Sequence, residues 1–260
     1  MPDPKLSLVV PAFDEERRIA ASLERIGAFL AARDYATEVV VVDDGSAAPG
    51  HEAVATAVAR LPETVAGRLI CHETNRGKGA AVRTGCLAAA GEYVAFIDAD
   101  LATPPEEILA LVAALDAGAD VAVGVRNQSD GTDMRDRRSL SRRLYGRLFS
   151  LLMQAILLPG ISDSQCPLKA FKRDAAQRLF RLQRIDTWSF DAELLFLARR
   201  LGLKVANIPV RWKAMPGSHL QLNLRTAAEL RNLARIRIAH RGVSPKTLAA
   251  DTNAAPAPEA

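Results

Sequence analysis

The residues best suited to chemistry stand where short apolar runs end. Asp98-Ala99-Asp100 follows the run 93–97, and two further acidic stretches, FDEE at 13–16 and DDGS at 43–46, follow the runs 6–11 and 38–42. Two carboxylates at this spacing can approach one hard cation where the chain turns, and Mg²⁺ commonly combines one or two carboxylates with substrate phosphates. The spacing therefore suggests a divalent cation site, although acids ahead of Pro104 are also typical of turns and helix caps.

A glycine-rich loop, NRGKG at 75–79, precedes an alanine-rich segment. Glycines let the backbone approach a ligand closely, and the N-terminus of a helix favours anions. The spacing of a P-loop is absent, and Val82 stands where a dinucleotide fingerprint needs a third small residue. The loop is therefore a candidate anion site of no assigned type.

The order of the apolar runs predicts an α/β protein with a doubly wound, mostly parallel sheet. The expected strands are 6–11, 38–42, 68–71, 93–97, 120–125 and 205–210, and the expected helices are 14–33, 51–61, 78–90, 105–117 and 190–201. No element is identified between Pro167 and Phe190. Because ligands of open α/β sheets bind beyond the carboxyl ends of the strands, the acidic stretches are expected to meet in one cleft. Their mutual repulsion would be relieved by a cation or a hydrogen-bonding ligand.

The charge of the chain is unevenly distributed. The 260 residues carry a net charge of +4, but the windows 135–147 and 225–241 together carry +9 and the remainder −5. Leucines recur at helical spacing among the arginines of 140–155, which is typical of a basic amphipathic helix that lies on a bilayer. The alternative is that both basic helices pack their apolar faces on the folded core. No nucleic-acid partner is expected, because only 5% of the residues are aromatic and stacking rings are therefore scarce.

The cysteines and the termini indicate a cellular location. Cys71, Cys86 and Cys166 are far apart, so neither a disulfide framework nor a cysteine metal site is expected. The N-terminus lacks the pattern of a signal peptide, and the longest apolar run, 148–158, is 11 residues long, against about 20 for a spanning helix. We expect a reduced, cytoplasmic protein that can touch a membrane but does not cross it.

Eight stretches, taken in order, carry a family resemblance that no single motif carries. They are VVPAFDEERRI (9–19), VVVVDDGS (39–46), NRGKGAAVRTG (75–85), FIDADLATPPE (96–106), GVR (124–126), DSQCPLKAFKR (163–173), WSFDAELL (188–195) and VRWKAMPGSHL (210–220). With them the chain resembles the family 2 glycosyltransferases of GT-A fold, and within that family the dolichyl-phosphate β-glucosyltransferase and polyprenyl-phosphate glycosyltransferase group.

The resemblance implies a nucleotide-sugar site at the strand ends. The residues implied to bind the nucleotide sugar are Pro11, Ala12, Phe13, Glu15, Asp43, Asp44, Lys78, Asp98 and Ala99. Asp98 and Asp100 are the implied ligands of Mg²⁺ or Mn²⁺, which would offset diphosphate charge. Asp43 would contact the base edge, and Asp44 would support the turn.

The resemblance also implies an acceptor site and three catalytic residues, Asp100, Arg126 and Asp191. The residues implied to hold the acceptor or a phosphate are Arg126, Arg142, Arg143, Asp163, Gln165 and Lys169. Arginine suits this role because its planar fork bonds phosphate oxygens bidentately. For Asp191 the alternative is a helix cap or a buried structural acid; as a functional residue it orients the acceptor first and acts as a base second, because a phosphate acceptor is already ionised.

The implied reaction is an inverting, metal-dependent transfer of a hexose to a polyprenyl or dolichyl phosphate at the membrane surface. Ala102 stands where mannose-type relatives have glutamine, which favours glucose and a UDP-sugar. The alternatives are GDP-mannose or a soluble acceptor, and, in another class, a non-catalytic nucleotide-sugar-binding scaffold. The expected organisation is a catalytic domain over 1–222, an amphipathic helix over 223–242 and a disordered tail over 243–260. A homo-oligomer is left open.

Overall fold

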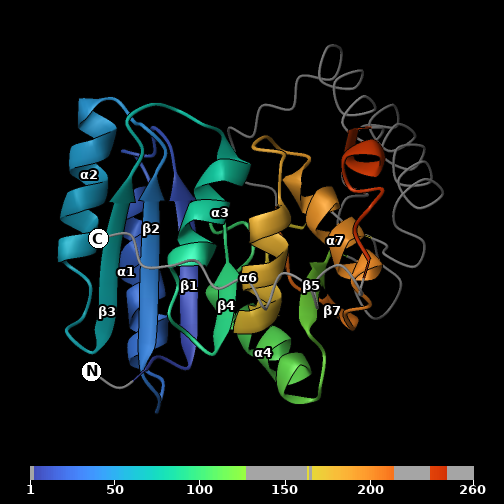
Figure 1. Cartoon of the computed structure of the whole chain (residues 1–260). Coiled ribbons are helices and arrows are strands. Elements are labelled where there is room, and N and C mark those ends of the chain that lie inside the picture. The colour runs from blue at the N-terminus through green and yellow to red at the C-terminus, as the bar shows by residue number, and fades with distance from the viewer. Residues whose placement is uncertain (1–2, 127–162, 164–165, 214–234, 245–260) are drawn as a thin grey trace, which may run out of the picture.

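The computed structural model describes residues 3–126, 163, 166–213 and 235–244. Its centre is a seven-stranded sheet in the order β3-β2-β1-β4-β6-β5-β7, with helices on both faces (Figure 1). The strands are β1 (Leu6–Ala12), β2 (Thr37–Asp43), β3 (Val65–Cys71), β4 (Tyr93–Phe96), β5 (Val121–Val125), β6 (Lys169–Lys172) and β7 (Val205–Pro209). All strand pairs are parallel except those that β6 makes with β4 and β5. The predicted α/β fold with a mostly parallel sheet is confirmed.

Alternate residues of the central strands feed two hydrophobic layers. Val40 and Val42 of β2 pack with α3 (Lys78–Ala88), α6 (Arg173–Leu182) and α7 (Phe190–Arg200). Val39 and Val41 pack with α1 (Ile19–Ala31), α2 (Ala48–Ala59) and α4 (Ile108–Asp116) on the other face. A strand that is covered on both faces must be apolar throughout, which explains the continuous valine run of β2.

Two elements were missed by the sequence analysis, β6 and α6. The strand β6 has only four residues and two are lysines, so it shows no apolar run. Its Lys169 is nevertheless fully buried. Helix α6 is strongly amphipathic, with Ala175, Ala176, Leu179 and Phe180 buried on one side, a spacing that the sequence does carry. The short 3₁₀ turn η1 (Pro105–Glu107) precedes α4.

Helix α1 begins at Ile19, five residues later than expected. Asp14 has a φ of 51°, a left-handed conformation that interrupts a helix. The side chain of Asp14 accepts a hydrogen bond from the Ala47 N–H at 3.1 Å, and its own N–H donates to Ser46 Oγ at 2.9 Å. The segment after β1 is thereby tied to the turn after β2 instead of continuing into α1.

The expected basic helix over 140–155 lies outside the described residues, as does most of the second one. The described end of the second contains Ile236 and His240, which are fully buried, whereas Ile238 is 66% exposed. Beyond it, Val243 packs against the core and its carbonyl accepts a hydrogen bond from Arg200. The expected domain boundaries stay predictions. Within the described ranges, no helix combines the length and the apolar character needed to cross a membrane.

Candidate active site

The Asp98-Ala99-Asp100 turn lies at the carboxyl end of β4, in the middle of the sheet. The Ile97 N–H still pairs with the Val9 carbonyl at 3.0 Å, and the chain then turns. Ser22 of α1 donates a 2.5 Å hydrogen bond to the Ala99 carbonyl, and the Ala102 N–H donates to Asp100 Oδ1 at 3.0 Å. The turn is thus held through its backbone.

Lys78, the first residue of α3, offsets part of the negative charge of this turn. Its Nζ lies 2.5 Å from Asp98 Oδ1. Burial alone would lower the pKa of Lys78, but the carboxylates of Asp98, Asp191 and Asp100 outweigh burial and raise it. Lys78 therefore stays charged, because the carboxylates of Asp98 and Asp100, after β4, and of Asp191, in α7, favour its protonated form.

Carboxylates crowd this end of the sheet. The pKa of Glu15 is raised by burial and by the charges of Asp100 and Asp98, against the opposing effect of Arg18. The pKa of Asp100 is raised by burial and by Asp98, against the Ala102 hydrogen bond and Lys78. Each ionised acid therefore makes its neighbours harder to ionise. An oxygen-rich, mutually repelling set of this kind fits a hard divalent cation such as Mg²⁺ or Mn²⁺.

Asp191 reaches the same site from the first turn of α7. Its Oδ1 accepts a 2.6 Å hydrogen bond from Lys169 Nζ, which also donates to the Cys166 carbonyl at 2.7 Å. Burial raises the pKa of Asp191 although Lys169 and Lys78 oppose it. Lys169, which was expected to bind the acceptor, is fully buried behind Asp191. Its geometry is that of a residue that holds Asp191.

The acids after β2 are embedded differently. Asp44 accepts hydrogen bonds from the N–H groups of Arg76 and Gly77, at 3.0 and 2.8 Å, and from His72 at 2.7 Å. Gly77 has a φ of 103°, and a Cβ there would meet the Asp186 carbonyl at 2.5 Å. Asp44 and the glycine-rich loop form one unit, which agrees with the expected support of the turn.

Asp43 is satisfied through both of its carboxylate oxygens. Oδ1 accepts from the Ser46 N–H at 3.1 Å, and Oδ2 lies 2.8 Å from His51 Nδ1. Burial acts to raise the pKa of Asp43, but these hydrogen bonds from Ser46 and His51 together outweigh it and lower the pKa. A nucleobase that contacted Asp43 would share oxygens that already have partners.

The loop between α6 and α7 closes over the glycine-rich loop. The Asp186 carbonyl accepts from the Gly79 N–H at 2.7 Å. Glu193, fully buried, fixes the start of this loop by accepting from the N–H groups of Arg184 and Ile185 at 3.0 and 2.9 Å. Trp188 is 56% exposed, and its ring lies 4.7 Å from Lys78 Nζ. Sequence reasoning missed Asp186, because its contact uses the backbone carbonyl and leaves no trace in residue type.

Arg126 and Asp163 form a bidentate pair beyond β5. Arg126 Nε and Nη2 donate to the two oxygens of Asp163 at 2.6 and 2.7 Å. The guanidinium group also lies 5.4 Å from the Trp212 ring centroid. These two predicted site residues are therefore brought together, although Asp163 is 97% covered and holds the arginine.

The remaining predicted residues line the edge of the site or fall outside it. Phe13 is 44% exposed, whereas Ala12 and Ala99 are each 3% exposed. Pro11 is partly buried at the end of β1. Three acceptor candidates, Arg142, Arg143 and Gln165, lie outside the described residues.

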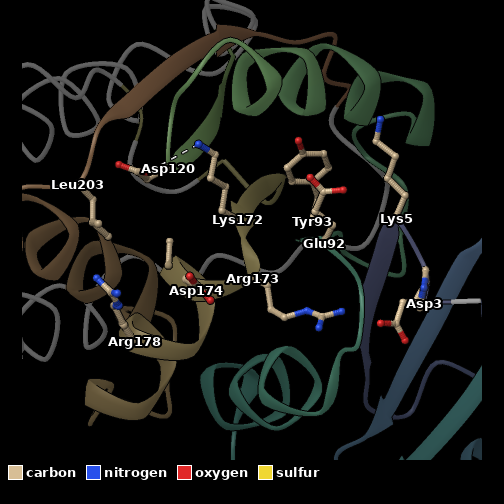
Figure 2. A pocket seen from close by; sticks show the side chains of 12 residues that line it. Asp3, Lys5, Glu92, Tyr93, Asp120, Lys172, Arg173, Asp174, Arg178 and Leu203 are labelled. Carbon is tan, nitrogen blue, oxygen red and sulfur yellow. Dashed lines mark ion pairs between the residues drawn. The ribbon is translucent and has the colours of Figure 1, made fainter. Parts of the chain in front are cut away.

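A cavity of about 700 Å³ lies at the opposite edge of the sheet (Figure 2). Its lining includes residues at the amino ends of β1, β4 and β5, and its charges are balanced between four bases and four acids: Lys5, Lys172, Arg173, Arg178, Asp3, Glu92, Asp120 and Asp174. Lys172 and Asp120 are 3.9 Å apart. Among the described residues, no predicted site residue lines this cavity. The described acids predicted to act as metal ligands, Asp98 and Asp100, lie instead at the carboxyl edge of the sheet.

The sequence and the fold match those of known proteins. The family model for glycosyl transferase family 2 matches residues 7–180, and the chain belongs to that family. It is therefore a glycosyltransferase.

Several relatives share most of the chain. The dolichyl-phosphate β-glucosyltransferase of Dictyostelium discoideum is 31% identical over 89% of this chain and 73% of its own length. Those of Drosophila melanogaster and Homo sapiens are 35% and 32% identical, each over 84% of this chain and 70% of their own lengths.

Solved structures share the fold. Glucosyl-3-phosphoglycerate synthase from Mycobacterium tuberculosis in complex with UDP has a TM-score of 0.65 at 21% identity, covering 92% of this chain and 81% of the other. The same enzyme in complex with Mn²⁺, UDP-glucose and phosphoglyceric acid has a TM-score of 0.60 at 21% identity, covering 92% of this chain and 80% of the other.

Proposed function

We propose that this glycosyltransferase transfers a hexose, with glucose favoured, from a nucleotide diphosphate sugar to a polyprenyl or dolichyl phosphate. The observation that carries the proposal is the meeting of Glu15, Lys78, Asp98, Asp100 and Asp191 at the carboxyl edge of the sheet. The names of the relatives, dolichyl-phosphate β-glucosyltransferases that align over most of the chain, support the acceptor and the sugar.

The donor half of the site is proposed to hold UDP-glucose together with Mg²⁺ or Mn²⁺. Asp98 and Asp100 would hold the cation, which supplies charge that offsets the diphosphate and stabilises the leaving nucleotide. The raised pKa values of Glu15 and Asp100 support a cation here. Lys78 adds a positive charge beside Asp98, and the exposed ring of Phe13 suits stacking against a base. A protein of the same fold, glucosyl-3-phosphoglycerate synthase from Mycobacterium tuberculosis, has been solved in complex with UDP-glucose and Mn²⁺.

The acceptor half is proposed to use Asp191 and Arg126. An oxygen of the lipid phosphate attacks the anomeric carbon, a new carbon–oxygen bond forms, and the bond to the nucleoside diphosphate breaks with inversion. A phosphate monoester is ionised at neutral pH, so this step takes no proton from the nucleophile and needs little general-base help. Asp191, held by Lys169, would orient the acceptor, and Arg126, held by Asp163, would bond a phosphate oxygen.

The membrane is proposed to be reached by the basic segments of the second half. The windows 135–147 and 225–241 together carry +9, and a basic residue near an anionic bilayer contributes about 1 kcal/mol. The proposal includes peripheral attachment at the inner face of the cytoplasmic membrane, and a catalytic unit over 1–222 followed by the amphipathic segment 223–242.

The test is a transfer assay with polyprenyl phosphate and dolichyl phosphate, each with UDP-glucose and GDP-mannose as donors. The expected product is glucosyl phosphoryl lipid, formed with Mn²⁺ or Mg²⁺ and not with a chelator. If mannosyl phosphoryl lipid were the main product, GDP-mannose would replace UDP-glucose as the proposed donor. A nucleotide-sugar-binding protein that makes no glycolipid and releases no nucleotide would support the scaffold alternative and overturn the proposal.

A second part of the experiment distinguishes a soluble acceptor from a lipid acceptor. Phosphoglyceric acid, which is present in the structure of a fold neighbour, replaces the lipid in the same assay. Sedimentation with liposomes is measured at low and high salt. The proposal expects salt-sensitive sedimentation and no transfer to the soluble acid. Transfer to the acid without liposome binding would contradict the lipid acceptor.

A further inference from the structure

A second set of metal donors lies near the site, separate from the Asp98–Asp100 turn. Among the residues that the structure describes, Asp43, His51 and Cys71 bring a carboxylate oxygen, an imidazole nitrogen and a thiol sulfur within 4.8 Å of one another. His51 Nδ1 lies 2.8 Å from Asp43 Oδ2 and 3.9 Å from Cys71 Sγ. Three donor types converge from three different elements.

The fold places these donors with little freedom. Asp43 and Cys71 are the last residues of β2 and β3 and are direct partners in the parallel pairing, so their side chains leave the same face of the sheet. The His72 N–H donates to the Asp43 carbonyl at 2.8 Å and locks this register. His51 comes from the first turn of α2. Gly50 allows α2 to approach the strand ends, because a Cβ there would lie only 3.0 Å from Ser46 Cβ.

The donor set differs in kind from the other one. Oxygen ligands alone suit Mg²⁺ and Mn²⁺, whereas a thiolate and an imidazole with one carboxylate suit Zn²⁺ and similar transition metals. The His51 side chain is 48% exposed and Cys71 is exposed, so an ion can enter from solvent and one position stays open. Neither lies among the residues proposed to bind substrate.

We propose that Asp43, His51 and Cys71 bind a Zn²⁺-type transition metal ion at the ends of β2 and β3. On binding, the Cys71 thiol gives its proton to solvent, and the imidazole carries its remaining proton on Nε2. The ion thereby replaces the contact between His51 Nδ1 and Asp43 Oδ2.

The site has a consequence for donor binding, and this consequence alone rests on the proposed function. The family resemblance implies that Asp43 contacts the base edge of the donor, and an ion on its Oδ2 would compete with the base for the same carboxylate. Zn²⁺ is therefore expected to weaken UDP binding, whereas Mg²⁺ and Mn²⁺ act at Asp98 and Asp100.

The cysteines provide a direct reporter of the ion. Cys71 is exposed, whereas Cys86 and Cys166 are buried, so Cys71 should react with iodoacetamide faster than the other two thiols. Burial also raises the pKa of Cys86 well above its usual value, which keeps that thiol inert. The experiment measures alkylation of the whole protein by mass spectrometry against added Zn²⁺, and the absorption spectrum with Co²⁺.

Zn²⁺ at tenfold over its dissociation constant should slow alkylation of Cys71 about tenfold, because only the metal-free thiol reacts. Co²⁺ should give a sulfur-to-metal charge-transfer band with one equivalent bound. His51→Gln should abolish both effects while Cys71 still reacts, and Asp100→Asn, the matched control at the other donor set, should keep them. Unchanged alkylation with Zn²⁺, or equal protection in His51→Gln, overturns the metal site.

UDP binding, measured by calorimetry with and without Zn²⁺, tests the consequence. Wild-type affinity should fall with Zn²⁺, and Cys71→Ser should lose this sensitivity while its transfer activity stays at the wild-type level. Protection of Cys71 without any change in UDP affinity would retain the metal site and overturn the competition. Protection in a protein that makes no glycolipid would mean that the proposed function fails and the metal site stands.

Discussion

The acids at the end of β2 and the acids around β4 lie at the same edge of one sheet, but their pKa values are shifted in opposite directions. Hydrogen bonds to Asp43 outweigh its burial and lower its pKa. The pKa values of Glu15, Asp100 and Asp191 are raised, because burial and neighbouring acids outweigh the cations beside them. The first region stabilises its charges with the protein's own donors; the second leaves repulsion that a bound cation would remove.

The difference indicates that Asp44, after β2, has a structural role (the scaffold), whereas the acids around Asp100, after β4, form the catalytic site (the working site). Asp44 ties the turn after β2 to the glycine-rich loop through two backbone N–H groups, so its removal should be felt in folding. Within the described part of the chain, Asp100 accepts one backbone hydrogen bond, from Ala102, and the charge of Asp98 raises its pKa. Perturbed, mutually coupled carboxylates of this kind mark functional sites, because stability alone would not select them.

The largest expected effect is the loss of transfer in Asp100→Ala. Removal of a cation ligand forfeits several kcal/mol of transition-state charge stabilisation, so activity should fall by about 10³-fold or more. The free energy of unfolding should stay near the wild-type value or rise, because a repelling buried charge is gone. Circular dichroism with urea unfolding and the transfer assay measure the two quantities. A variant that keeps metal-independent activity would show that the cluster is not the working site.

Lys169→Met tests whether the buried pair of Lys169 and Asp191 is energetically coupled. Asp191 would lose its buried partner at 2.6 Å, and loss of one member of a buried pair costs about 3–5 kcal/mol. The double variant Lys169→Met with Asp191→Asn should recover much of this stability but not the activity. Equal stability of the single and double variants would show that the pair is not coupled.

Asp44→Ala tests whether Asp44 stabilises the fold by holding the glycine-rich loop. It would leave the N–H groups of Arg76 and Gly77 without their acceptor, at a cost of about 1–3 kcal/mol for each group that stays buried. Thermal unfolding should show the loss, and Asp14→Ala, which removes one exposed acceptor, is the matched control with a smaller change. A fully stable Asp44→Ala protein would contradict the scaffold role.

The sequence predicted the parallel strands and the acidic strand ends because both signals are local. Continuous valines in β2 and acids after β1, β2 and β4 can be read without knowing any contact. The strand β6 could not be read in this way, because Lys169 is buried by virtue of a partner, Asp191, that lies 22 residues away. The roles of Asp186 and Glu193 depend on backbone groups of distant loops, so residue type alone could not indicate them.

The smallest expected effect is the pH dependence of stability in chelator-treated protein. The lowered pKa of Asp43 means that its stabilisation is present above its ordinary value of 3.8 and is lost as pH falls below it. The raised pKa of Asp191 gives the reverse: its contribution is full below 3.8 and is lost as pH rises through the higher folded-state value.

Urea unfolding of Asp43→Asn and Asp191→Asn between pH 3 and 7 measures these contributions as differences from wild type. The difference for Asp43→Asn should grow with pH near the acid end, and the difference for Asp191→Asn should shrink. Parallel pH curves for the two variants would remove the distinction between the two regions.

We propose that a divalent cation, bound together with the donor diphosphate, relieves the repulsion among the acids around Asp100. Calorimetric titration with UDP, in the presence of Mn²⁺ or of a chelator, tests it directly. We expect Mn²⁺ to tighten UDP binding by at least about tenfold in the wild-type protein, equivalent to about 1.4 kcal/mol, and not in Asp100→Asn. Equal UDP affinity with and without Mn²⁺ in the wild-type protein would contradict a cation site at Asp100.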